Sequence, residues 1–161
     1  PPRSTPKPAS AASDVYKRQH EAWLIHRGLE TLEVRFARMC ASAQAVAELA
    51  AGHPAVRAVV YPGLADHPDA EVVARQMTAA GGLVGLRFAD AAAAERFIAA
   101  AQYVVPQTSF GGTHTAAERR ARWGDDVPDG FVRLSVGVEP TAELLADLER
   151  AMTAAGGGPT A

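Results

Sequence analysis

The sequence has little cysteine, no long apolar run and almost no net charge. A single cysteine, Cys40, in 161 residues excludes an internal disulfide and a cysteine-based metal site. No apolar run approaches the ~20 residues that a helix needs to cross a bilayer, so we expect no membrane partner. A net charge of -2 gives no electrostatic reason to expect nucleic acid. These absences favour a soluble, cytoplasmic domain, and the length is sufficient for one domain with its own core.

The first nineteen residues differ in composition from the rest of the chain. PPRSTPKPASAASDVYKRQ is basic, rich in proline, serine and alanine, and poor in residues that could be buried, which predicts disorder. The chain begins with proline rather than methionine, and SDVYKRQ resembles translated adapter sequence at the ends of assembled environmental reads. We therefore expect residues 1–19 to be foreign to a longer protein. A natural basic targeting arm is the alternative.

A long helix is predicted after this leader. Apolar residues recur every three or four positions from Ala22 to Ala50, which predicts one linking helix over residues 20–52. Gly28 interrupts the pattern and predicts a bend or a close backbone approach. The helix is expected to end at Gly52, before His53-Pro54. A helix of this length at the start of a small domain is typical of a segment that bridges two bodies.

Short strands and helices alternate in the rest of the chain. Strands are expected over residues 56–61, 83–88, 103–106 and 131–138, and helices from about residues 68, 91 and 141. About three or four mostly antiparallel strands covered by helices predict an α+β two-layer domain over residues 53–155. The residues from 156 to 161 are expected to form a flexible tail.

The last expected strand carries the arginine of most interest. Val132 and Leu134 lie on an aliphatic side that should pack against helices, which leaves Arg133 and Ser135 on the other side. A guanidinium there either stays solvated or salt-bridged, or it binds a carboxylate or phosphate through its planar fork. The residues alone leave both interpretations open.

Four ordered stretches carry a resemblance to a known family. GFVRLSVGVEP with TAELLADLERAM, at residues 130–152, resembles the C-terminal end of the Cys/Met-metabolism PLP-dependent (transsulfuration) enzymes. This family includes cystathionine γ-lyase, cystathionine γ-synthase, cystathionine β-lyase and methionine γ-lyase. Three further stretches agree in order: AWLIHRGLETLEVR (22–35), HPAVRAVVYPGLADHPDAEVVARQM (53–77) and TSFGGTH (108–114). The resemblance covers residues 20–155 and implies the small C-terminal domain of a fold-type I PLP enzyme.

The resemblance implies roles for individual residues. Arg133 would hold the α-carboxylate of a sulfur amino-acid substrate. Ser109, Phe110 and Gly111, in a turn completed by Gly112, would approach the substrate through backbone groups, which glycine permits because it lacks a Cβ. His114 stands where many relatives carry glutamate, and would be either a polar wall of the substrate pocket or a proton shuttle.

Two departures from the family bear on function. ERRARWGDDVPDG (118–130) replaces the family's H-P-x-x-M-T-H stretch and resembles a variant of bacterial cystathionine γ-lyase-like members; we expect a salt-bridged loop there. The family also needs a lysine that forms a Schiff base with pyridoxal 5'-phosphate, whereas the only lysines here are Lys7 and Lys17. We therefore expect a fragment that is inactive alone and has no catalytic, cofactor-binding or metal-binding residues.

The full-length enzyme is expected to act as a homotetramer. It would cleave or exchange a C–S or C–O bond at the γ-carbon of cystathionine or an activated homoserine, as a cystathionine γ-lyase. Cystathionine γ-synthase, O-acylhomoserine sulfhydrylase and methionine γ-lyase are the alternatives within the family. A non-catalytic, stand-alone α+β interaction module is the alternative outside it.

Overall fold

The computed structural model describes residues 8–157, with side chains from residue 18 onward. Two compact units make up the chain, Pro1–Val34 and Arg35–Ala161. The expected single helix is two helices, α1 (Pro8–Glu30) and α2 (Leu32–Ala51), and the interruption falls at Thr31 rather than at Gly28. A Cβ on Gly28 would meet nothing within 4 Å, so the expected close approach there is wrong.

The leader also differs from its expectation. Residues 8–19, for which the composition predicts disorder, are helical. Helix α1 begins at Pro8 rather than near His20. Residues 1–7 lie outside the described residues, as do residues 158–161 of the expected tail. The foreign origin of residues 1–19 stays a prediction.

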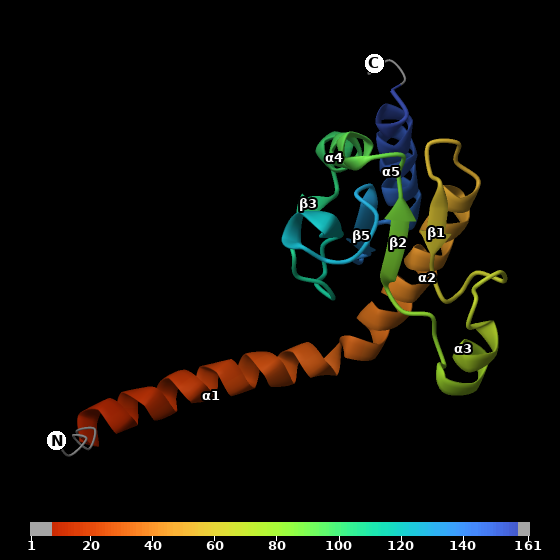
Figure 1. The fold of residues 1–161 in the computed structure, drawn as a ribbon. Helices are drawn as coiled ribbons and strands as arrows, with labels where there is room; N and C mark the ends of the chain where they lie inside the picture. The colour runs from red at the N-terminus through yellow and green to blue at the C-terminus, as the bar shows by residue number, and fades with distance from the viewer. Residues whose placement is uncertain (1–7, 158–161) are drawn as a thin grey trace. The chain divides into compact units, whose positions relative to one another are not determined.

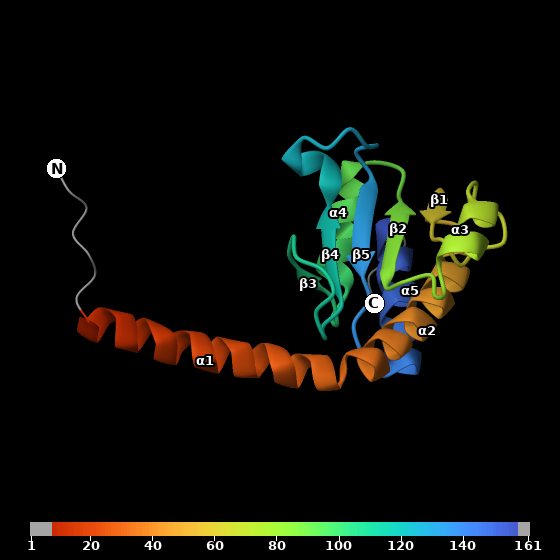
Figure 2. The ribbon, with the colours of Figure 1, turned by 90° about the horizontal axis from the view of Figure 1, so that it is seen from below.

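The sheet has five strands rather than three or four, in the order β1-β2-β5-β4-β3 (Figure 2). Neighbours are antiparallel except β3 and β4, which are parallel. The unexpected strand is β4, whose sequence AAER has low β-propensity. It forms because it pairs with β5 on one side and β3 on the other. The strands are β1 (Ala58–Val60), β2 (Leu83–Arg87), β3 (Val105–Pro106), β4 (Ala116–Arg119) and β5 (Phe131–Ser135).

Helices cover one face of this sheet (Figure 1). The face is packed by α2, α4 (Ala91–Ala100) and α5 (Thr141–Ala155), while α3 (Ala70–Gln76) has no buried residue. The N-terminus of α4 is capped by Asp90, whose side chain accepts a hydrogen bond from the Ala93 amide at 2.8 Å. The expected mostly antiparallel sheet with helices over one face is confirmed.

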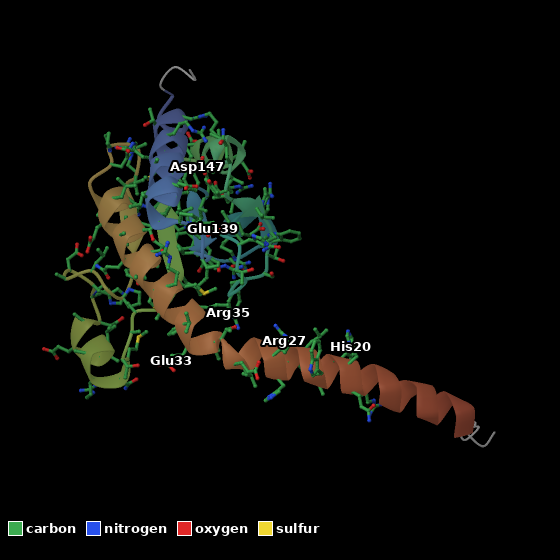
Figure 3. The ribbon with its side chains drawn as sticks, turned by 180° about the vertical axis from the view of Figure 1, so that it is seen from behind. His20, Arg27, Glu33, Arg35, Glu139 and Asp147 are labelled. Carbon is green, nitrogen blue, oxygen red and sulfur yellow. The ribbon has the colours of Figure 1, made fainter. Side chains whose placement is uncertain are left out.

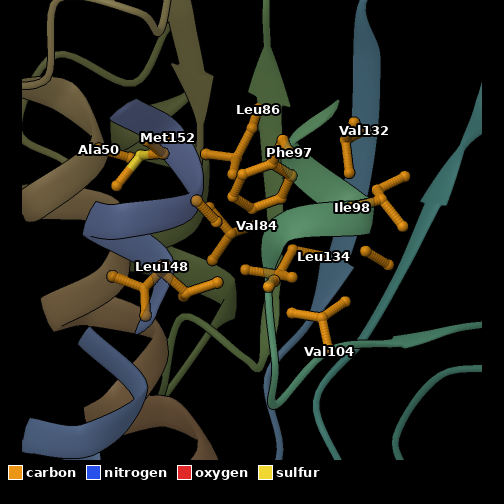
Figure 4. Packing of buried hydrophobic residues seen from close by; sticks show 14 of the residues in the cluster. Ala50, Val84, Leu86, Phe97, Ile98, Val104, Val132, Leu134, Leu148 and Met152 are labelled. Atoms are coloured by element: carbon orange, nitrogen blue, oxygen red, sulfur yellow. The ribbon is translucent and has the colours of Figure 1, made fainter. Parts of the chain in front are cut away.

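The core lies between the sheet and these helices (Figure 4). Val84, Val132 and Leu134 are 0% exposed, and the ring of Phe97 on α4 packs tilted against the Phe88 ring, with centroids 4.8 Å apart. Among the described residues, no core helix packs on the opposite face of the sheet, which we call the open face. Val60 and Leu83 on it are 53% and 40% exposed, although Ser135 and Glu118 on the same face are buried. Because side chains alternate along a strand, every residue between two core residues of β5 points to this open face.

Two polar contacts fix the chain around the core. Asp147 on α5 (Figure 3) is 7% exposed and accepts hydrogen bonds from the amides of Gln102 and Tyr103, which holds the segment leaving α4. Burial raises the pKa of Tyr61 to about 12, and its hydroxyl donates to the Gly81 carbonyl at 2.9 Å.

No helix within residues 8–157 is long and apolar enough to cross a membrane.

Candidate functional site

Arg133 lies at the centre of the open face. Its strand, β5, pairs with β2 on one side and β4 on the other, so that Arg133 is directly opposite Gly85 and Glu118. The neighbours Val132 and Leu134 are buried in the core, which confirms the alternation expected for this strand. The predicted position of Arg133, on the face without helices, is therefore correct.

A loop crosses over β5 and contacts the Arg133 guanidinium. The Nη2 group of Arg133 donates a hydrogen bond to the carbonyl of Thr108, and the guanidinium carbon lies 5.1 Å from the centroid of the Phe110 ring. A ring at that distance attracts a cation through its quadrupole. One carbonyl uses only part of a fork that carries five N–H donors. The guanidinium is thus oriented, but it has no carboxylate partner among the described residues.

The glycine turn is fixed to the same strand. Gly111 has a φ of +76°, which favours glycine, and its amide donates to the Ser135 hydroxyl at 2.9 Å. Ser135 is 3% exposed and lies two positions from Arg133 on the same face. Ser109 and Phe110, between these two anchors, are exposed. Thus the Phe110 ring lies at Arg133 and the Gly111 amide at Ser135. The Ser109 side chain makes no hydrogen bond with the described residues.

His114 lies farther along the sheet. A Cβ on Gly137 would come within 2.7 Å of the His114 carbonyl carbon, which places His114 beside the segment that follows β5. The next residue, Thr115, is fully buried and bonds both oxygens of Glu139 (Figure 3), at 2.6 Å through its amide and 2.7 Å through its hydroxyl. His114 is therefore held near Glu139, and it makes no hydrogen bond with Arg133.

The replaced loop is ordered by ion pairs. After β4 the chain forms the short 3₁₀ helix η1 (Arg120–Trp123), in which Arg120 pairs with Asp125 at 2.7 Å. Arg119 and Arg122 both reach the same oxygen of Glu95 on α4, at 2.7 and 2.9 Å. The expected salt bridges are present, but within a strand and a helical turn rather than a loop.

The sequence did not reveal that Glu118 and Trp123 are neighbours of this site. Glu118 is 5% exposed, and its Oε1 accepts a hydrogen bond from the indole Nε1 of Trp123. A cavity of about 540 Å³ is lined by Trp123, Glu118 and Thr108. Only the pairing of β4 with β5 brings Glu118 beside Arg133, and no local pattern signals that pairing.

The described residues offer no metal site and do not fit a covalently held PLP. They contain no group of three or more histidine, cysteine, aspartate or glutamate side chains placed to hold a metal ion. Lys7 and Lys17, the only lysines of the sequence, fall outside residues 18–157, whose side chains the structure describes. No chemical step through PLP can be derived from these residues.

The family model described as "Cys/Met metabolism PLP-dependent enzyme" matches residues 14–153. Over 133 residues the chain is 46% identical to a candidate cystathionine gamma-lyase of Streptomyces coelicolor, covering 82% of this chain and 34% of that protein. It is 43% identical over 141 residues to a cystathionine gamma-synthase of Mycobacterium bovis, covering 82% of this chain and 36% of the relative.

Solved structures agree with these matches. The crystal structure of metB from Corynebacterium glutamicum superposes with a TM-score of 0.78 at 38% identity, covering 82% of this chain and 37% of that one. The chain thus spans about a third of the length of the relatives it matches. The relatives are named for both lyase and synthase activities, so the comparisons do not select one member. By sequence and by fold, this chain belongs to the Cys/Met metabolism family of PLP-dependent enzymes.

Proposed function

We propose that this chain is the substrate-binding C-terminal domain of a PLP-dependent enzyme that acts on C–S bonds of sulfur amino acids, with cystathionine γ-lyase as the first candidate. The observation that carries the proposal is Arg133, a guanidinium on the open face of the sheet with no carboxylate partner among the described residues. Its planar fork matches a carboxylate in a bidentate geometry. A substrate carboxylate is the anion that a family acting on amino acids would present there.

The surrounding contacts suit a binding role for Arg133. Phe110 and the Thr108 carbonyl restrict the guanidinium, so less side-chain freedom is lost when a carboxylate binds. The Gly111 turn brings backbone close to the same place without a Cβ in the way. In this proposal Arg133 binds and orients the substrate. The substrate is bordered by Ser109, Phe110 and Gly111. His114 is a wall residue of the pocket, farther from the carboxylate.

The cofactor is assigned to a part of the enzyme outside this chain. PLP belongs to the family's chemistry, and a lysine in an upstream domain would hold it. The apolar stripe of α1 supports a further body that would pack on it, since Ile25 is 66% exposed and Leu29 is 59% exposed. We propose residues 20–52 as the linking segment and residues 53–155 as the small domain of a cytoplasmic, tetrameric enzyme.

This assignment predicts that the chain alone does not fix PLP. After incubation with PLP and reduction by sodium borohydride, we expect no added cofactor mass on peptides from residues 18–157, because they contain no lysine amine. Intact-mass and peptide mass spectrometry would measure this. A reduced PLP adduct within residues 18–157 would contradict the assignment.

A longer reading frame that contains this chain would test the reaction itself. We expect it to encode an upstream lysine, to bind PLP, and to show a higher kcat/KM for cleavage of L-cystathionine than for replacement reactions of O-acetyl-L-homoserine. The reverse preference would favour a synthase or sulfhydrylase, and preference for L-methionine would favour a methionine γ-lyase. A longer frame without any such lysine would favour the stand-alone interaction module.

A further inference from the structure

Arg133 differs from the arginines of β4 and η1. On β4 and η1, Arg119 and Arg122 pair with Glu95, and Arg120 pairs with Asp125. Among the described residues, the Arg133 guanidinium contacts the Thr108 carbonyl and the Phe110 ring but no carboxylate, although Glu118 lies directly opposite it on β4. Residues directly opposite in an antiparallel pair have Cβ atoms about 5 Å apart and point to the same face. These two long side chains are therefore within reach of an ion pair, yet they do not form one.

The indole of Trp123 accounts for the absence of a Glu118–Arg133 ion pair. Glu118 is buried, and a buried carboxylate needs a donor because its desolvation is otherwise uncompensated. Trp123 supplies that donor to Oε1 from η1, and η1 is itself held by the ion pairs of Arg120 and Arg122. Oε1 of the Glu118 carboxylate thus has a donor other than Arg133.

Resting on the proposed function, we infer that Trp123 is a positioning residue that keeps Arg133 available to the substrate carboxylate. By holding Glu118, it prevents an internal Glu118–Arg133 ion pair that would compete with the substrate for the same guanidinium. Trp123 lies in the segment that departs from the family's usual sequence. That departure then has a role at the substrate site, through Glu118 rather than through direct contact with the substrate.

The inference predicts a loss that a second substitution reverses. In Trp123→Phe the indole donor is absent, Glu118 turns to Arg133, and affinity for a free carboxylate falls about tenfold, as expected when a charge-assisted contact must be displaced. In Trp123→Phe with Glu118→Gln the competing charge is gone, and affinity returns to within about twofold of the original chain. A role for Trp123 in packing alone would not be reversed by Glu118→Gln.

The measurement is an NMR titration of the ¹⁵N-labelled 161-residue chain with L-methionine, with L-methioninamide, which lacks the carboxylate, as the parallel probe. Trp23→Phe is the matched control, because that indole lies on α1 and stacks on His20. Its affinity should be unchanged. An unchanged affinity in Trp123→Phe, or no recovery in the double variant, would overturn the inference.

Glu118→Gln alone keeps the test decisive if Trp123→Phe does not fold. A glutamine oxygen still accepts the indole N–H, so this variant should fold and bind L-methionine as well as the original chain or better. Weaker binding would overturn the inference, because the Glu118 charge would then assist the carboxylate. Arg133→Leu in the same titration separates the two proposals. If Arg133→Leu binds normally, the proposed function fails; if it alone loses binding, only the role of Trp123 fails.

Discussion

Replacing Arg133 by leucine should lower kcat/KM for an amino-acid substrate about 100-fold in the full-length enzyme that we propose carries this chain, because a bidentate, charge-assisted contact is lost. The loss should appear mainly as a higher KM, since the contact with the α-carboxylate is present before and during the reaction. The amount of bound PLP, measured by its absorbance, should stay unchanged, because no described residue near Arg133 is suited to hold the cofactor covalently.

Two controls make this result specific. Arg133→Lys keeps the charge but loses the planar fork, so it should recover only part of the activity. Arg87 is an exposed arginine on the same face, and on β2 it lies two positions from the residue opposite Arg133. Arg87→Leu should change kcat/KM less than about twofold. Loss of PLP from Arg133→Leu would contradict the role assigned to Arg133.

Gly137→Ala should destabilise the chain by about 3 kcal/mol, the upper part of the range for overpacking. A Cβ at this position would collide with the Thr113 carbonyl oxygen and would lie 2.7 Å from the carbonyl carbon of His114. These are backbone atoms, and the Val138 amide fixes them by donating to Thr113 at 3.0 Å. The strain cannot be relieved by a rotamer change, so it should displace the loop that orients Arg133.

Urea unfolding followed by circular dichroism would measure the change in the free energy of unfolding. Gly112→Ala is the matched control in the same loop. A Cβ there meets nothing within 4 Å, and its φ is not in the left-handed region, so its unfolding free energy should change by less than about 0.5 kcal/mol. Equal midpoints for the two variants would show that the close contact at Gly137 does not exist in solution.

The position of Arg133 could be predicted because it depends on a local pattern. Val132 and Leu134 are aliphatic and alternate with Arg133 and Ser135, and a strand places such sets on opposite faces. The glycine turn was equally local, since Gly111 takes a positive φ. In contrast, β4 has a sequence that does not favour strands, and it exists because two other strands pair with it. Local propensity cannot report such a long-range pairing.

The contacts around Arg133 depend on β4, the strand that the sequence did not predict. Glu118 lies opposite Arg133 only through the register of β4 with β5, and Trp123 reaches Glu118 only because η1 folds back. The single helix predicted from the long apolar stripe is wrong for a different reason. Its period predicted one helix, but a helical period does not show whether the helix is interrupted or whether the stripe is buried within the same chain.

A crystal structure of this chain with L-methionine would test the central claim most directly. We expect the carboxylate of L-methionine on the open face of the sheet, with its two oxygens about 2.8 Å from the guanidinium nitrogens of Arg133, and the Phe110 ring still beside the guanidinium. A carboxylate bound at another arginine, with Arg133 contacting only the Thr108 carbonyl, would contradict the assignment of Arg133 as the substrate-binding residue.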